Sequence, residues 1–167
     1  MDRLIVGITG ASGTPLACRF VNQLKEFTEC EVHVVASDSA RLTAQYEAPD
    51  AFKKMLSCAD VVHDNASIGE SIASGTFKTK GMVIIPCSMK TVAGIASGYS
   101  DNLVLRAADV TLKEQRPLVL LARETPMSPI HLSHIHPSPM ILQYCHSYLG
   151  FHIQSHPLLQ LLYSSHS

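Results

Sequence analysis

Short apolar runs alternate with amphipathic stretches along the first 124 residues of the chain. Runs that are apolar throughout are typical of strands buried on both faces of a parallel sheet. They lie at residues 4–6, 32–36, 82–86 and 118–121. Between them, apolar residues at helical spacing predict helices at residues 15–26, 38–46, 50–58, 102–115 and from about Ser88. Strands that alternate with helices imply parallel pairing, so we expect an α/β fold with a parallel sheet.

The pattern changes after Glu124. All 13 Lys and Arg and all 14 Asp and Glu lie at or before this residue, whereas residues 125–167 hold seven of the nine histidines. At the upstream frequency, about nine charged residues are expected in that stretch. Its prolines interrupt any helix, and we place no element there, although residues 140–142 and 157–163 are apolar enough to pack. The C-terminal part is therefore atypical for the fold.

Composition excludes several classes of protein. A net charge of −1 argues against a nucleic-acid binder, because phosphate binding needs a basic excess. The five cysteines are scattered without a CxxC pair, and no signal peptide precedes them, so we expect a reduced, cytoplasmic setting. No apolar stretch is long enough to predict a membrane span. His131, His134 and His136 are clustered, but no carboxylate is near to orient the rings, so we expect no metal site.

A glycine-rich turn, Gly7-Ile8-Thr9-Gly10-Ala11-Ser12-Gly13, joins the first strand to the first helix. Thr14 suits the N-cap of that helix, and Pro15 its first position. Backbone amides at such a helix start favour an anion, which predicts a phosphate-bearing ligand. The turn is not a P-loop, but it resembles a dinucleotide fingerprint with Asp38 placed to bind a ribose. A tight turn that binds no ligand is the alternative.

The segment Pro86-Cys87-Ser88-Met89-Lys90-Thr91 is a second turn from strand to helix. Its hydroxyls and helix-start amides suit another polar group of the same ligand. Cys87 lacks a nearby activating histidine, so we interpret it as a buried structural thiol. Lys90 alternatively is a solvated helix residue.

Two further pairs of charged residues are candidates. Arg106 and Lys113 share one helix face with Asp109. They either bind a phosphate or form a local series of ion pairs. Arg123 and Glu124 follow a strand, at the edge where α/β enzymes place catalytic groups, unless they are an exposed loop pair.

Taken together, these residues resemble the UbiX/Pad-type flavin prenyltransferases over residues 2–132. The shared motifs are GITGASG, Ser37, GTF near Ser74, PCSMKT, the NLxxRAADVxLKExRPLVL run and RETP. The resemblance implies a flavodoxin-like, three-layer fold in a trimer-based dodecamer. It also implies transfer of a dimethylallyl group from dimethylallyl phosphate to N5 and C6 of reduced FMN, without a metal. The product, prenylated FMN, serves a UbiD-type decarboxylase.

The resemblance assigns roles to matching positions. The expected FMN contacts are Gly10, Ala11, Ser12, Ser37, Ser88, Met89, Lys90 and Thr91, and Arg123 corresponds to an FMN or phosphate contact. Arg106 and Lys113 correspond to the prenyl-phosphate environment. Ser12, Glu47 and Glu124 are the expected catalytic residues, with Ser12 in proton removal. A non-catalytic FMN-binding protein and an NAD(P)-binding oxidoreductase of the Rossmann type remain alternatives.

The chain departs from the family after residue 132. We therefore divide it into a flavin-binding domain, residues 1–132, and an uncharged tail, residues 133–167. The family supplies a tyrosine and an arginine for the prenyl phosphate in this region, and the tail contains no arginine. Codons for residues 145–156, shifted by one base, can encode VILTLAFISKAI, which is closer to the strand that the family has there. We hypothesise that the tail is read in a shifted frame, and that activity is impaired as a result.

Overall fold

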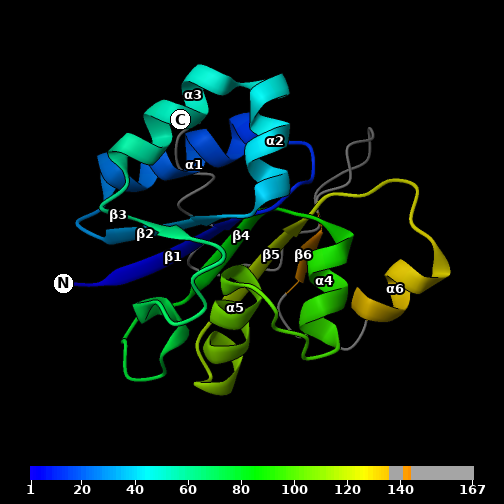
Figure 1. Cartoon of the computed structure of the whole chain (residues 1–167). Helices are drawn as coiled ribbons and strands as arrows, with labels where there is room; N and C mark the ends of the chain where they lie inside the picture. The colour runs from blue at the N-terminus through cyan, green and yellow to red at the C-terminus, as the bar shows by residue number, and fades with distance from the viewer. Residues whose placement is uncertain (136–140, 144–167) are drawn as a thin grey trace.

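A six-stranded sheet, with strand order β3-β2-β1-β4-β5-β6, is the framework of the computed structural model, which describes residues 1–135 and 141–143 (Figure 1). The strands are β1 (Arg3–Ile8), β2 (Glu31–Ala36), β3 (Val61–Asp64), β4 (Met82–Cys87), β5 (Leu118–Ala122) and β6 (Ile141–Gln143). Every neighbouring pair is parallel, as the sequence predicts. The order reverses direction between β1 and β4, which is the Rossmann-type arrangement and places a crevice at their carboxyl ends.

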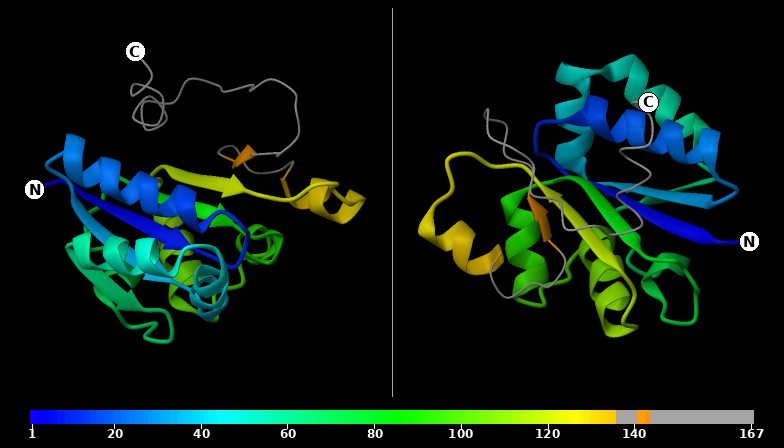
Figure 2. Two further views of the ribbon diagram at one scale, coloured as in Figure 1. Left: turned by 90° about the horizontal axis from the view of Figure 1, so that it is seen from above. Right: turned by 180° about the vertical axis from the view of Figure 1, so that it is seen from behind.

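Helices cover both faces of the sheet and make the expected three-layer sandwich (Figures 1 and 2). One face carries α1 (Thr14–Phe27), α2 (Asp38–Glu47) and α3 (Pro49–Cys58). The other face carries α4 (Met89–Ala96), α5 (Leu103–Lys113) and the short 3-10 helix η1 (Ser71–Ala73). A sixth helix, α6 (Pro129–Ile135), lies beyond the end of β5 and contacts α4.

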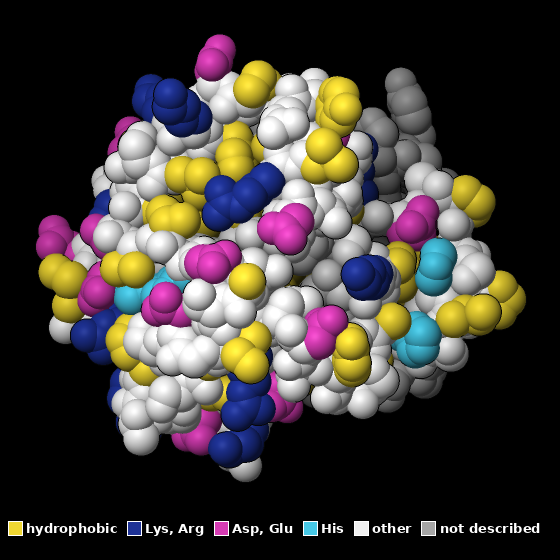
Figure 3. Space-filling view, in the orientation of Figure 1, with side chains coloured by type: hydrophobic (Ala, Val, Ile, Leu, Met, Phe, Trp, Pro, Cys, Tyr) yellow, Lys and Arg dark blue, Asp and Glu magenta, His cyan; other side chains and the backbone are white. Residues whose placement is uncertain are grey.

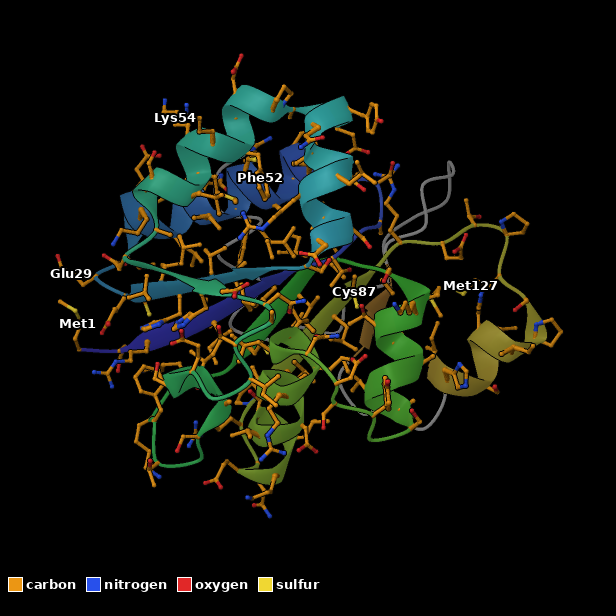
Figure 4. All side chains as sticks on the ribbon, viewed as in Figure 1. Met1, Glu29, Phe52, Lys54, Cys87 and Met127 are labelled. Carbon is orange, nitrogen blue, oxygen red and sulfur yellow. The ribbon has the colours of Figure 1, made fainter. Side chains whose placement is uncertain are left out.

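The alternation of side chains along each strand builds two separate cores. In β1, Leu4 and Val6 pack toward α1–α3, whereas Ile5 packs toward α4 and α5. Phe52 of α3, labelled in Figure 4, lies in the first core and is 7% exposed. Because β1, β2, β4 and β5 are buried on both faces, their sequences are mostly apolar, which explains why they are recognisable.

Local capping fixes the helix boundaries. The Asn102 side chain accepts from Leu105 N at 3.1 Å and begins α5, and Ser88 caps α4 in the same way. Pro49 occupies the first turn of α3 and separates it from α2. The expected N-cap at Thr14 is wrong, because Gly13 is the cap and Thr14 is already helical.

The structure contains elements that the sequence pattern did not predict. The strand β3 has only two apolar residues in sequence and one fully buried side chain, His63, so its pattern is weak. The prediction of no element after Glu124 is wrong for α6 and β6. Pro129 is compatible with a first helical turn, and Ser128 Oγ accepts from His131 N at 3.2 Å, so α6 needs no charged cap. Within the described ranges, no helix is both long and apolar enough to cross a bilayer.

Candidate active site

A cavity of about 480 Å³ opens where β1, β4 and β5 end. Ligands in α/β sheets bind at this reversal of strand order, and the volume is that of a small-molecule site. Three turns line the cavity, and they contribute Gly10, Ala11, Ser12, Ser88, Met89, Arg123, Glu124 and Thr125. The structure therefore brings together seven of the predicted site residues from three distant parts of the chain.

The first wall is the turn between β1 and α1. Gly10 is required there because a Cβ atom at this position would lie 2.5 Å from Ser39 Cβ, at the start of α2. Gly13 has a φ of 127°, a conformation that other residues rarely adopt. These two glycines allow the backbone to turn closely beneath the cavity before α1 begins.

Glu47, the last residue of α2, reaches this turn from the side. Its Oε1 accepts from Ser12 Oγ at 2.5 Å, and its Oε2 accepts from Gly13 N at 2.9 Å and Thr14 N at 2.8 Å. Slight burial works to raise the pKa of Glu47, but these hydrogen bonds outweigh it and hold the pKa below its usual value. Glu47 is thus an ionised carboxylate in direct contact with the Ser12 hydroxyl.

This contact changes the interpretation of the glycine turn. We expected backbone amides at the start of α1 to bind an anionic ligand, and they do bind an anion, but it is the protein's own carboxylate. While Glu47 holds the Gly13 and Thr14 amides, a ligand phosphate would need donors other than these two.

The second wall is the turn between β4 and α4. Ser88 Oγ lies 3.1 Å from Thr91 Oγ1, so Thr91 turns toward the cap rather than the cavity. Lys90 is exposed and does not line the cavity in this chain. The first backbone amides of α4 have no intrahelical acceptor. The start of this helix is therefore compatible with a bound anion.

Cys87 is a buried structural thiol, as the sequence predicts. It lies at the carboxyl end of β4, between the sheet and α4 (Figure 4). Its side chain is inaccessible to solvent, and burial raises its pKa far above the usual value. A thiol in this state is not a nucleophile at neutral pH.

The third wall follows β5. Arg123 N donates to Cys87 O at 3.1 Å, which joins this wall to the second. The guanidinium lies over the glycine turn, since a Cβ atom at Gly13 would be 3.4 Å from Arg123 Nη1. Glu124 and Thr125 complete the wall. Arg123 is thus the cation that all three turns surround, and a phosphate in the cavity would lie within its reach.

Other predicted site residues lie away from this cavity. Ser37 Oγ accepts from Ala40 N at 3.1 Å and caps α2. Arg106 pairs with Asp109 at 3.0 Å, which matches the ion-pair alternative within this chain. Lys113 is exposed in the last turn of α5. Figure 3 shows a group of Lys and Arg side chains at the bottom of the molecule, on the side where α5 lies. The roles of these residues and of Lys90 and Thr91 remain predictions.

The described residues offer no group of side chains that could hold a metal ion. Among residues 1–135 and 141–143, no three His, Cys, Asp or Glu side chains are placed to hold an ion. His131 Nδ1 accepts from Ser128 N at 3.3 Å, and His136 lies outside the described residues.

Comparison with known proteins identifies the family. A family model described as Flavoprotein matches residues 1–143. Flavin prenyltransferase UbiX of Escherichia coli K12 is 50% identical over 135 residues, which are 81% of this chain and 70% of that protein. The chain thus spans about 70% of the length of this relative.

Two solved structures agree in fold and sequence. One is a dodecameric FMN-dependent UbiX-like decarboxylase from Escherichia coli O157:H7, with a TM-score of 0.78, 48% identity, and coverage of 80% of this chain and 73% of that one. The other is AnUbiX (PadA1) in complex with FMN and dimethylallyl pyrophosphate, with a TM-score of 0.79, 40% identity, and coverage of 84% and 76%. The relatives do not favour the NAD(P)-binding alternative. The chain belongs to the UbiX-type flavin prenyltransferases of the Flavoprotein family.

Proposed function

We propose that this chain transfers a dimethylallyl group from dimethylallyl phosphate to reduced FMN, which is its second substrate. The observation that carries the proposal is the cavity where a serine backed by an ionised carboxylate faces an arginine–glutamate pair. The backbone amides at the start of α4 and the guanidinium of Arg123 suit an anionic mononucleotide, and the relatives are flavin prenyltransferases.

The residues around the cavity divide the work. Arg123 provides charge for the phosphate that departs from the prenyl donor. Ser12 accepts a proton through its hydroxyl, because Glu47, 2.5 Å away, is ionised and takes the hydroxyl proton in turn. Glu124 stands beside Arg123 on the same wall and supplies acid–base chemistry at the phosphate.

Arg106 and Lys113 lie outside the cavity of their own chain. We propose that they act on the prenyl phosphate of a neighbouring copy, in a homo-oligomer like the dodecamer formed by the UbiX-like relative. A half-buried arginine and an exposed lysine on one face of α5 suit a phosphate presented from outside the chain. We also propose that a UbiD-type decarboxylase receives the product and that the protein acts in the cytoplasm.

The uncharged tail weakens this activity in our proposal. Residues 133–167 contain no arginine, whereas the family resemblance places a phosphate-binding arginine after residue 132. Loss of one charge-assisted hydrogen bond costs about 1.5–3 kcal/mol, or about one to two decades in donor affinity.

A direct assay tests the proposal. The purified protein is incubated without oxygen with reduced FMN and dimethylallyl phosphate, and the flavin is analysed by mass spectrometry against a reaction without donor. We expect a flavin with the mass of one added prenyl group. Bound flavin of unchanged mass would instead support the non-catalytic FMN-binding alternative.

A further inference from the structure

Thr9 is a buried polar residue immediately after β1, between two of the turns that line the cavity. Its side chain is 3% exposed, and it does not itself line the cavity. A buried hydroxyl needs hydrogen-bond partners, and the partners of Thr9 lie on the opposite turn.

The Thr9 hydroxyl joins two residues on either side of Cys87. Oγ1 donates to Pro86 O at 2.9 Å and accepts from Ser88 N at 2.8 Å. The Thr9 amide also donates to Pro86 O at 3.1 Å. One residue therefore holds both ends of the turn that presents Ser88 and Met89 to the cavity.

This link lies where the regular sheet pairing stops. The pairing of β1 with β4 ends at Gly7 and Ile84, and the pairing of β4 with β5 is irregular between Ile84 and Cys87. Pro86 has no amide hydrogen to continue a ladder. The hydroxyl of Thr9 replaces the missing ladder contacts at the point where the strands reach the cavity.

We infer that Thr9 is a positioning residue, which sets the separation of the first and second cavity walls and thereby the affinity for FMN. The inference rests on the proposed function, because FMN is the ligand that both walls would contact. Without the hydroxyl, Ser88 N would lose its acceptor, and the Ser88 turn would move to find another one.

Three variants test the inference. Thr9→Val removes the hydroxyl and keeps the shape, whereas Thr9→Ser keeps the hydroxyl. Thr111→Val is the matched control, because Thr111 is 1% exposed and its Oγ1 donates to Ala107 O at 2.7 Å within α5. FMN affinity is titrated by flavin fluorescence well below each variant's unfolding temperature, which is measured in parallel.

We expect Thr9→Val to weaken FMN binding about tenfold. This change corresponds to the free energy of roughly one buried hydrogen bond. Thr9→Ser should restore the affinity to within about twofold, and Thr111→Val should lower the unfolding temperature without changing affinity. If Thr9→Val does not fold, Thr9→Ala removes the same hydroxyl with less steric demand and is titrated instead.

Two outcomes separate the inference from the proposed function. If the unmodified protein binds FMN and the folded Thr9→Val or Thr9→Ala variant binds it equally well, the positioning role is overturned and the proposed function stands. If the unmodified protein does not bind FMN, the proposed function fails first.

Discussion

Glu47 ends α2 with its Oε1 atom 2.5 Å from the Ser12 hydroxyl, although the two residues lie 35 positions apart in the sequence. The same carboxylate accepts hydrogen bonds from two backbone amides at the start of α1. Glu47 therefore both closes the glycine turn and holds the serine that faces the cavity. A single side chain couples the local fold of the turn to its chemistry.

Replacement of Glu47 by glutamine tests this coupling. We expect Glu47→Gln to lower the rate of prenylated-flavin formation about 100-fold at saturating substrates, the usual contribution of a general base. The control is Asp50→Asn, which alters an exposed carboxylate in the first turn of α3 and should leave the rate unchanged. A Glu47→Gln enzyme with the unmodified rate would remove Glu47 from proton transfer.

The pH dependence of the same step follows from the hydrogen bonds of Glu47. They hold its pKa below the usual 4.5, so the carboxylate stays ionised as the pH falls toward that value. We expect no loss of rate from this group between about pH 8 and pH 5, measured under saturating conditions. An acid limb in this range that Glu47→Gln abolishes would contradict the assignment.

Arg123 is expected to dominate anion binding in the cavity. Arg123→Gln keeps much of the side-chain length but removes the charge, and we expect substrate affinity to fall about 10- to 100-fold. Arg19→Gln is the matched control, because Arg19 is an exposed residue on α1 outside the cavity. Calorimetric titration with FMN and with the prenyl donor shows which phosphate Arg123 serves, and equal affinities for the two variants would refute the role.

Much of this site is predictable from local sequence. The turns at Gly10 and Ser88 carry glycines, caps and apolar strands within a few residues, and parallel strands end at one edge. These signals are enough to predict that two walls and Arg123 meet at the same edge of the sheet. They are strong because each depends on neighbours in the chain.

Other features depend on contacts between distant residues, and local patterns do not contain them. Glu47 lies at an ordinary helix end, and only the fold brings it to Ser12. In the sequence Thr9 is simply part of a glycine-rich turn, although its hydroxyl forms hydrogen bonds with residues 77 and 79 positions away. Arg106 shares a helix face with Lys113 as expected, but a helix face alone does not show whether it meets the cavity of its own chain or that of another copy.

The reading-frame hypothesis for the tail makes a prediction of its own. We expect the coding DNA to show a gained or lost base near the codons for residues 133–144, so that the shifted frame downstream encodes charged residues. Sequencing of the DNA and the intact mass of the purified protein check this. An in-frame reading of residues 133–167 by both methods would refute the hypothesis and leave the absence of charge as a property of the protein.

Subunit mixing tests the proposal that Arg106 and Lys113 serve a neighbouring copy. The double variant Arg106→Ala/Lys113→Ala and the single variant Arg123→Gln should each be nearly inactive as pure oligomers. If the site is shared between copies, co-expression in equal amounts regenerates about one quarter of the sites, because each needs one intact contribution from each of two chains. Activity no greater than the sum of the two variants would place all three residues in one chain.

The buried His33, which contacts a second buried histidine, is expected to make the stability of the fold sensitive to pH. His33 Nδ1 and His63 Nε2 lie 2.9 Å apart, and the outer ring nitrogens contact Glu31 at 3.1 Å and Glu70 at 3.2 Å. Arg3 and Phe77 pack around the same pair. Burial lowers the pKa of His33, with a further lowering from His63, and these outweigh the hydrogen bond to Glu31 that works to raise it.

A lowered pKa means that the unfolded chain binds a proton at His33 more readily than the folded chain does. The stability that neutral His33 contributes is therefore fully present above the unfolded-chain pKa of 6.5, and this contribution is lost as the pH falls below that value. The free energy of unfolding should fall by up to about 1.4 kcal/mol per pH unit for this proton. Urea unfolding at about pH 7.5 and pH 5.5 measures the effect.

The variant His33→Phe removes the titrating group and keeps an aromatic ring beside Phe77. We expect it to be less stable at neutral pH, because His63 Nε2 and Glu31 Oε1 each lose the contact with the His33 ring, but to lose less stability on acidification than the unmodified protein. The control His134→Asn, in α6 and outside the sheet, should keep the original pH dependence. If His33→Phe and the unmodified protein lose equal free energy between the two pH values, the acid sensitivity arises elsewhere and His33 titrates in the folded protein as it does in the unfolded chain.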